Sequence, residues 1–503
     1  MSLLLLLCLM LACLPIDWPA PPFDLGPAGS AVLTGTVIVG LLLVARLFSA
    51  TTVSRLACDP RDRVAIGRAH GLRRHLYFLL NLSGFGLMLT GCGWAFTANQ
   101  LMTVGDWLLP GAEVVVLAPY LITLVGSWAI FFDAEHALHR SSPDPAVNAE
   151  FWTRCGYVFL LLRCHVLVFV PLGFTIVQFG VLRVAPAILD TLSSQVIIVV
   201  GLVAFIVLVP LLLPLMLGLR SMPPGRLRTR IEAAAQRLGV RYHKLYIWPT
   251  RGSLATAMVA GLTPRLRQIA FTDLLLATLT EDEIEAVFGH EVGHVKHRHL
   301  LYYATFFLLS SLTMWVVYQV VQQFPGLTPV SKNAGLLLST LATGAYLFLA
   351  FGFVSRRCER QADVFGCKSV SCSDPACRGH APDTALVAGG KSLCRTGVAT
   401  FVRALERVDE SNGTSNSSAS AGRGVFSRMA GMLRLVGTWL GAWQHSTIAK
   451  RVAFLRTLAE DPLRERRFQR RVTALRWGLL LLLTGAVVAI VALHGWKSML
   501  EAV

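Results

Sequence analysis

The chain has 503 residues, of which 54% are hydrophobic and only 15% charged, and its formal net charge is +17. Soluble globular proteins carry about 25% charged residues, so this composition argues against an ordinary soluble domain. In a soluble protein the positive charge would suggest a nucleic-acid partner. Here the basic residues are concentrated in particular loops between apolar runs, which indicates membrane topology and no nucleic-acid partner.

Apolar runs dominate the chain. A helix that crosses a bilayer needs roughly 20 apolar residues, and we find eight runs of about that length. They lie at about 31–49, 75–97, 112–132, 156–181, 194–219, 300–323, 336–354 and 474–495. A ninth run, Leu3–Leu14, is short and lacks the basic start of a signal peptide, so we expect a short span or an interfacial segment in preference to a lipoprotein leader. The runs predict a mainly α, polytopic membrane protein with about eight or nine transmembrane helices.

The loop charges alternate from one apolar run to the next. Arginine is abundant in 51–74, 220–299 and 355–473, whereas 98–111, 182–193 and 324–335 hold one basic residue at most. Because positively charged loops stay in the cytoplasm, both large polar segments are predicted to face it. We expect an integral protein of the bacterial inner (cell) membrane.

These patterns divide the chain into five parts. The predicted parts are an N-terminal multi-span region 1–219, a first polar segment 220–299, a transmembrane hairpin 300–354, a second polar segment 355–473 with a flexible linker at 411–424, and a C-terminal transmembrane helix 474–503. The N-terminal region offers little chemistry. Its one polar cluster, Asp133–Arg140, is interpreted as a solvated helix at the membrane edge in preference to a metal site.

The first polar segment alternates helix and strand patterns. Ile231–Leu238 reads as an amphipathic helix, and Tyr242–Pro249, Leu254–Gly261 and Gln268–Thr272 read as strands. Thr280 and Glu283 form the pattern of a capping box, in which each side chain can bond the other residue's backbone N–H. We expect the helix that starts there to run through 284–299 directly into the span at 300–323.

That helix carries the motif His290-Glu291-Val292-Gly293-His294. Positions i and i+4 share one helix face, so the two imidazoles can bind one Zn²⁺ while Glu291 serves as general base. His297 and His299 follow closely and are interpreted as the polar end of a helix at the membrane boundary.

A catalytic zinc site uses three protein ligands and keeps one position open. The predicted hairpin 300–354 returns the chain to the membrane face of His290, where Glu359 is the best third ligand. Asp363 lies one helical turn later and could orient a ligand imidazole. Taken alone, Glu359 and its arginine neighbours would read as a surface helix with salt bridges; together with the histidine pair, the ligand interpretation is favoured.

The sequence from Gln268 to His299, and the Ser-Arg-Arg-x-Glu-x-x-Ala-Asp segment ending at Asp363, closely resemble the HtpX and CAAX prenyl endopeptidase family. The resemblance covers roughly 220–300, 355–366 and 440–456. It implies an α+β zincin-like catalytic domain at the cytoplasmic face, with His290, His294 and Glu359 as zinc ligands and Glu291 as the catalytic base.

The resemblance also implies residues that contact the substrate. The family has a late His-Pro-x-x-x-x-Arg segment, and His445 and Arg451 keep its histidine and arginine at that spacing without the proline. They are expected to bind the substrate and the transition state. The family's substrate-binding edge strand reads Asn-Ala-x-x-x-Gly, whereas this chain has Thr256, Ala257 and Gly261 at those positions. Threonine cannot present a carboxamide, so substrate preference is predicted to differ.

A cysteine-rich insert follows Asp363. Cys367, Cys372, Cys377 and His380 lie close together in sequence, and Cys394 comes later. The spacing is not that of a Cys-x2-Cys knuckle, so reduced cysteines in a loop are favoured over a second, structural zinc.

The residues together predict a zinc metalloendopeptidase that lies in the lipid bilayer and cleaves membrane proteins or membrane-tethered peptides. Membrane-protein quality control is favoured over CAAX-type processing of lipidated peptides. Two rival hypotheses are an inactive membrane scaffold of the same fold, against which the intact Glu291 argues, and a transporter, against which the scarcity of ionisable residues in the spans argues. The sequence makes no prediction of oligomeric state.

Overall fold

The computed structural model describes residues 18, 20, 26–104, 107–109, 111–141, 152–165, 209–322, 332–380, 385–387, 391–412 and 446–502. The segment Leu3–Leu14, nearly all of the linker 411–424, and most of the predicted spans 156–181 and 194–219 lie outside these residues.

The N-terminal helices have the length and apolar character of membrane spans. Two described helices are long and apolar enough to cross a bilayer, α2 (Gly26–Cys58) and α5 (Ala112–Arg140). Helix α3 (Arg63–Gly86) continues through a π-helical turn, Leu87–Gly91, and is bent by 63° from α4 (Trp94–Leu101), so this pair forms a third candidate. A short hairpin, β1 (Thr103–Val104) and β2 (Trp107–Leu108), connects α4 to α5.

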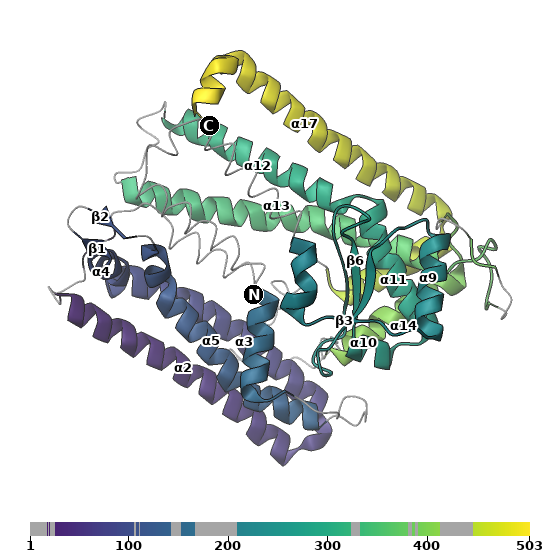
Figure 1. Cartoon of the computed structure of the whole chain (residues 1–503), viewed down its shortest axis with the longest axis horizontal. Helices are drawn as coiled ribbons and strands as arrows, with labels where there is room; N and C mark the ends of the chain where they lie inside the picture. The colour runs from purple at the N-terminus through teal and green to yellow at the C-terminus, as the bar shows by residue number, and fades with distance from the viewer. Residues whose placement is uncertain are drawn as a thin grey trace, which may run out of the picture.

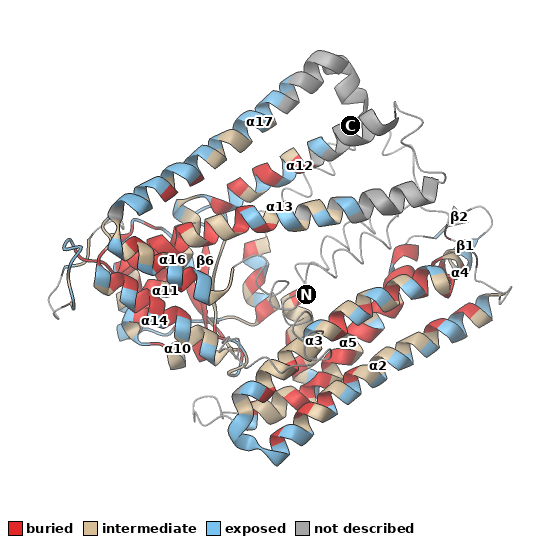
Figure 2. Cartoon of the chain, turned by 180° about the vertical axis from the view of Figure 1, so that it is seen from behind, coloured by how far each residue is buried: buried red, intermediate tan, exposed pale blue. Residues whose placement is uncertain are grey.

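Helices α2, α3 and α5 pack side by side, and one face of α2 is open (Figures 1 and 2). Val39, Leu43 and Leu47 recur every four residues on α2 and are at least half exposed. An exposed apolar stripe on a 33-residue helix suits contact with lipid tails.

Ion pairs join these helices at one end. The Asp133 carboxylate on α5 accepts bonds from Arg46 at 2.7 Å and Arg154 at 2.6 Å. The Glu135 carboxylate bonds to Arg74 and lies 3.2 Å from His70 Nε2. The polar cluster predicted at the membrane edge therefore ties α5 to α2 and α3.

Three long helices contain the later apolar runs. The predicted runs 336–354 and 474–495 fall within α13 (Lys332–Ser369) and α17 (Pro462–Ala502), and all but the last residue of the run 300–323 falls within α12 (His299–Gln322). Among the described residues of these helices, His299–Ser310 forms an apolar helical stretch that is too short for a full membrane span. In Figure 1 the three helices extend away from a globular part of the molecule, with α12 packed against both α13 and α17.

The globular part contains a four-stranded sheet in the order β3-β4-β6-β5. Its strands are β3 (Arg220–Ser221), β4 (Lys244–Trp248), β5 (Ala257–Ala260) and β6 (Gln268–Thr272). Strands β4 and β6 are parallel, and β5 pairs antiparallel with β6, placing Ala257 opposite Phe271 and Ala260 opposite Gln268. Strand β6 has its predicted bounds, while β4 and β5 are shorter than predicted.

Helices pack around the sheet and enclose the core. They are α9 (Arg226–Arg237), α10 (Asp273–Thr278), α11 (Glu281–Lys296), α14 (Arg395–Ser411) and α16 (Ile448–Glu460). Ile231, Ile269, Phe271, Phe288 and Val292 are fully buried in one cluster that joins the sheet to α9 and α11. This packing fixes α11, the motif helix, between the sheet and the helices that follow (Figure 2).

Two glycines let α11 and α13 cross closely. A Cβ at Gly289 would lie 1.9 Å from Ser369 Oγ, and one at Gly293 would lie 3.0 Å from Ala362 Cα. No larger side chain fits at Gly289 without moving a helix. The close crossing brings the motif histidines next to the 359–363 segment of α13.

The motif helix does not continue into the span, so this prediction is wrong. Helix α11 ends at Lys296, Arg298 adopts a left-handed conformation with φ of 55°, and α12 begins at His299. After this break His299 is buried, with an exposed fraction of 1%.

Candidate metal centre and active site

The start of the motif helix is held by its cap and by ion pairs. Thr280 Oγ1 accepts a bond from the Glu283 amide at 3.4 Å, and Glu283 accepts one from the Thr280 amide at 2.9 Å, so the predicted capping box is present. Glu283 also accepts from Arg407 of α14 at 2.6 Å. Buried Glu285 binds Arg230 at 2.7 Å and also contacts Arg237, both on α9. These contacts fix the position of α11 before its histidines are reached.

The three predicted ligands converge on one point. His290 Nε2 and His294 Nε2 are 3.3 Å apart. Glu359 places one carboxylate oxygen 3.8 Å from His290 Nε2 and the other 3.7 Å from His294 Nε2. A tetrahedral zinc ion with bonds of about 2.0–2.1 Å holds its ligand atoms about 3.4 Å apart. The spacing and chemistry of these three groups therefore fit zinc.

The side chains of this group are mostly buried. Glu359 is 5% exposed and His290 12%, whereas His294 is 25% exposed. The ring of His290 stacks on Phe401 of α14, with centroids 5.8 Å apart. The site is thus covered at Glu359 and His290 and is most exposed at His294. A catalytic zinc site needs such an opening for its free coordination position.

Asp363 lies behind His290, as an orienting residue should. Its Oδ1 is 3.0 Å from His290 Nδ1, and the carboxylate is fully buried. Burial by itself lowers the pKa of His290, but the carboxylates of Asp363 and Glu359 outweigh burial and raise that pKa above its usual value. The opposite holds for Asp363, since burial raises its pKa and the charges of Arg451 and His290 lower it overall. The carboxylate therefore stays ionised and favours a proton on Nδ1, which leaves Nε2 free to bind a metal.

Arg451 lies in this same buried cluster. Its Nε donates to Asp363 Oδ2 at 2.9 Å, and its Nη2 donates to Asp363 Oδ1. The guanidinium of Arg451 therefore bonds Asp363, and Asp363 in turn contacts His290. Its predicted contact with substrate stays a prediction, and His445 lies outside the described residues.

His299 joins the site from the other side, which the sequence interpretation missed. Its Nδ1 is 2.9 Å from His294 Nδ1, and its Nε2 is 3.1 Å from Gln361 Oε1. Gln361 in turn donates to Gln469 of α17 at 2.6 Å. If His294 binds metal through Nε2, its Nδ1–H donates to His299, and His299 then donates to Gln361. His294 thus has an orienting partner, as His290 has Asp363.

Replacing His299 with Ala is expected to lower zinc affinity about 10–100-fold while the chain still folds, because it removes the partner that fixes the His294 ring. Competition with a zinc chelator on purified protein measures this change. His243, an exposed histidine before β4, provides the matched His→Ala control. Equal zinc affinity in the His299→Ala variant and the parent chain would show that the contact does not orient His294.

The predicted substrate strand lies at the edge of the sheet and packs against α11. The Thr256 amide donates to Thr272 Oγ1 at 2.9 Å, and Ala257 begins β5. Gly261 has φ of 113°, and a Cβ there would lie 2.5 Å from Leu266 O. Thr256 and Gly261 therefore have structural roles at the ends of β5, while one edge of the strand has no partner in the described sheet.

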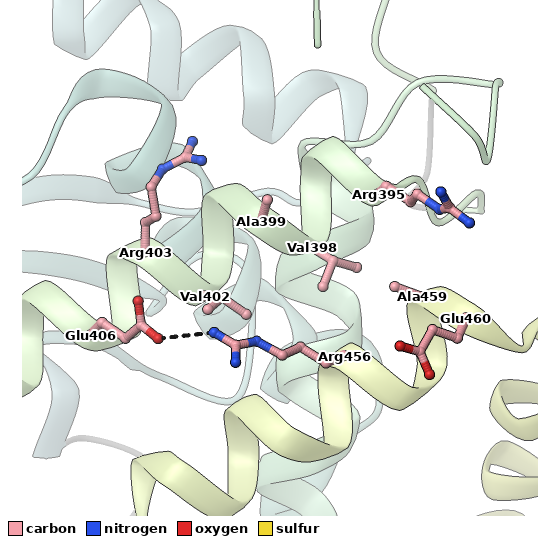
Figure 3. Close-up of a pocket in the computed structure, with 9 residues that line it drawn as sticks. All are labelled: Arg395, Val398, Ala399, Val402, Arg403, Glu406, Arg456, Ala459 and Glu460. Carbon is pink, nitrogen blue, oxygen red and sulfur yellow. Dashed lines mark hydrogen bonds and ion pairs between the residues drawn. The ribbon is translucent and has the colours of Figure 1, made fainter. Parts of the chain in front are cut away.

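A separate groove lies between α14 and α16 (Figure 3). Charged residues of both signs line it, among them Arg395, Arg403 and Glu460, and an ion pair of 3.5 Å joins Arg456 to Glu406. None of the groups that converge at the candidate metal centre lines this groove. The groove is therefore separate from the candidate metal centre at the α11–α13 crossing.

Part of this chain is similar to known proteases. The model for peptidase family M48 matches residues 222–382. A probable CAAX prenyl protease 1 from Schizosaccharomyces pombe is 32% identical over 188 residues, 33% of this chain and 38% of that protein. A protease HtpX homolog from Methanocaldococcus jannaschii is 29% identical over 150 residues, 28% of this chain and 52% of that protein. The chain thus spans between about a third and a half of the curated relatives it matches.

A solved structure shares the fold over a longer stretch. The crystal structure of S. mikatae Ste24p aligns with a TM-score of 0.51 and 14% sequence identity, covering 85% of this chain and 99% of that one. This likeness concerns the fold alone. The sequence matches show that residues 222–382 match a peptidase family M48 domain and that about a third of the chain is homologous to the CAAX prenyl protease 1 and HtpX proteins.

Proposed function

We propose that this chain is a zinc-dependent endopeptidase that hydrolyses peptide bonds of membrane-associated proteins. The observation that carries the proposal is the convergence of the ligand atoms of His290, His294 and Glu359, which lie 3.3–3.8 Å apart. Glu291 lies on α11 between the two histidines. When bound there, zinc would polarise the scissile carbonyl and acidify water.

The chain's own residues would divide the remaining work. The Glu291 carboxylate would accept the proton of the attacking water and then pass it to the leaving amine. Asp363 and His299 would hold the two imidazoles in orientation. His445 is proposed to stabilise the oxyanion with the metal, and Arg451 to contribute to binding the substrate.

The edge strand supports a way of binding the substrate. The outer edge of β5 could pair with an extended peptide, whose backbone would then lie along α11 and across the ligands. Because Thr256 offers a hydroxyl and no carboxamide at the start of this strand, the polar contact there is expected to be weaker or differently placed.

The candidate membrane spans α2 and α5, and the apolar stretch His299–Ser310 that follows the motif helix, favour substrates that are themselves in or on the membrane. Membrane-protein quality control is the favoured role. Processing of lipidated peptides is the second candidate, because several relatives are named CAAX prenyl protease 1. Incubating the purified chain with an unfolded membrane protein and, separately, with a prenylated peptide tests both by mass spectrometry. Fragments of the first alone support quality control, and cleavage of the peptide alone supports processing. Cleavage of neither by zinc-loaded protein would count against the endopeptidase.

Topology is expected to place the site in the cytoplasm, because the Arg-rich segments 51–74, 220–299 and 355–473 alternate with poorly charged loops. A reporter that fluoresces only in the cytoplasm should be bright when fused within 411–424 and dark when fused within 98–111, which serves as the opposite-side control. A dark fusion within 411–424 would overturn this orientation.

A further inference from the structure

Four side chains gather beyond the end of α13, away from the His290 site. Cys372, Cys377, His380 and Cys394 each place one ligand atom within 4.8 Å of the others'. The Cys394 sulfur and His380 Nε2 are 3.4 Å apart. Cys367, which the sequence grouped with this insert, lies instead within α13 and is buried there in the core of the domain.

We propose that Cys372, Cys377, His380 and Cys394 form a second zinc site with a structural role. Three thiolates and one imidazole are a common ligand set of structural zinc, and such sites are closed, with all four positions filled by protein. With Zn–S bonds of about 2.3 Å and a Zn–N bond of about 2.0 Å, a tetrahedral ion places sulfur and nitrogen about 3.5 Å apart. The Cys394–His380 separation fits this value.

The backbone at the start of α14 favours a thiolate at Cys394. The Gly397 amide donates to the Cys394 sulfur at 3.2 Å, and an amide can only donate, so the sulfur is the acceptor. Cys394 is the N-cap of α14, where the helix dipole also stabilises negative charge. These contacts suit a metal-bound sulfur.

A disulfide fits the cluster less well. One disulfide would use two of the three sulfurs and would leave a third thiol beside His380. All three cysteines are free in the structure. The cluster also combines residues of the loop after α13 with the start of α14. Zinc there would link His380 of the loop to Cys394 of the helix start, 14 residues later in the chain.

The joined elements are the ones that build the active site. Helix α13 supplies Glu359 and Asp363, and α14 supplies Phe401, which stacks on His290. A zinc ion at the cluster would fix the start of α14 relative to the end of α13. Because binding a structural metal is coupled to folding, its loss should lower thermal stability.

The test uses the full chain in detergent, with zinc replaced by cobalt. Thiolate ligands give cobalt a charge-transfer absorption that the His290, His294 and Glu359 set, which has no sulfur, cannot give. In the parent chain we expect that absorption and about two metal ions per chain. In the Cys377→Ser variant we expect about one metal ion per chain and a strongly reduced absorption. Cys58→Ser, at an exposed cysteine that ends α2, is the matched control and should keep both.

The results also separate this site from the active site. Glu359→Ala should lose one metal ion and keep the charge-transfer absorption. A parent chain without that absorption, or one with a disulfide among Cys372, Cys377 and Cys394 by mass spectrometry, would overturn the proposal, whatever the Cys377→Ser variant does. The proposal does not depend on proteolytic activity.

Discussion

Replacing Glu291 with Gln is expected to lower the turnover rate about 10²–10⁴-fold, the usual cost of losing a general base. The change keeps the size and shape of the side chain and removes its ability to accept a proton. His290, His294 and Glu359 remain, so zinc content and melting temperature should match those of the parent chain. Turnover of a cleaved substrate and zinc content are measured on the same preparations.

The matched control is Glu232→Gln on α9, where a partly exposed carboxylate pairs with Arg228 at 2.8 Å. It makes the same chemical change far from the zinc ligands in sequence and should leave turnover unchanged. A Glu291→Gln variant that turned over as fast as the Glu232→Gln variant would remove Glu291 from the mechanism and favour an inactive scaffold.

Replacing Glu359 with Ala is expected to remove zinc from the active site and to abolish turnover. Catalytic zinc sites use three protein ligands, and this variant keeps only His290 and His294. The zinc content should fall by about one per chain. Glu406→Ala, at an exposed glutamate on α14, is the control and should keep both zinc and turnover. Undiminished zinc in Glu359→Ala would show that another group is the third ligand.

The features that the sequence predicts well depend only on residues a few positions apart in the chain. Thr280 and Glu283 are three residues apart, and their capping box forms as predicted. The two motif histidines need only the helix period to share a face. Strand β6 is a run of buried residues with its predicted bounds. Glu359 is less local, since its selection as a ligand rests on the histidine pair and the returning hairpin.

The features that sequence missed depend on tertiary contacts. Arg298 takes a left-handed conformation that costs energy for any residue with a Cβ, and nothing in the local sequence marks a helix break there. The break places His299 against His294, although the spacing suggested a residue at the membrane boundary. Arg451 is likewise selected only by the family resemblance, as a residue that binds the substrate, and its burial against Asp363 requires α16 to pack on α13.

The cysteine insert shows the same limit. Its spacing matches no short-range zinc pattern, and the fourth ligand, Cys394, comes from the start of another helix. Only the fold brings it within reach of His380, 3.4 Å away.

Zinc titration into metal-free protein tests the central claim most directly. The Cys377→Ser variant is used, because it should hold zinc only at the active site, and cleavage of a membrane-protein substrate is followed as zinc is added. Cleavage should be absent without metal and should rise until about one zinc per chain is bound. The same titration of a variant that also carries Glu291→Gln should bind zinc equally and restore little cleavage. Full cleavage by metal-free protein, or equal cleavage by both zinc-loaded variants, would contradict a zinc-dependent endopeptidase that uses Glu291 as its base.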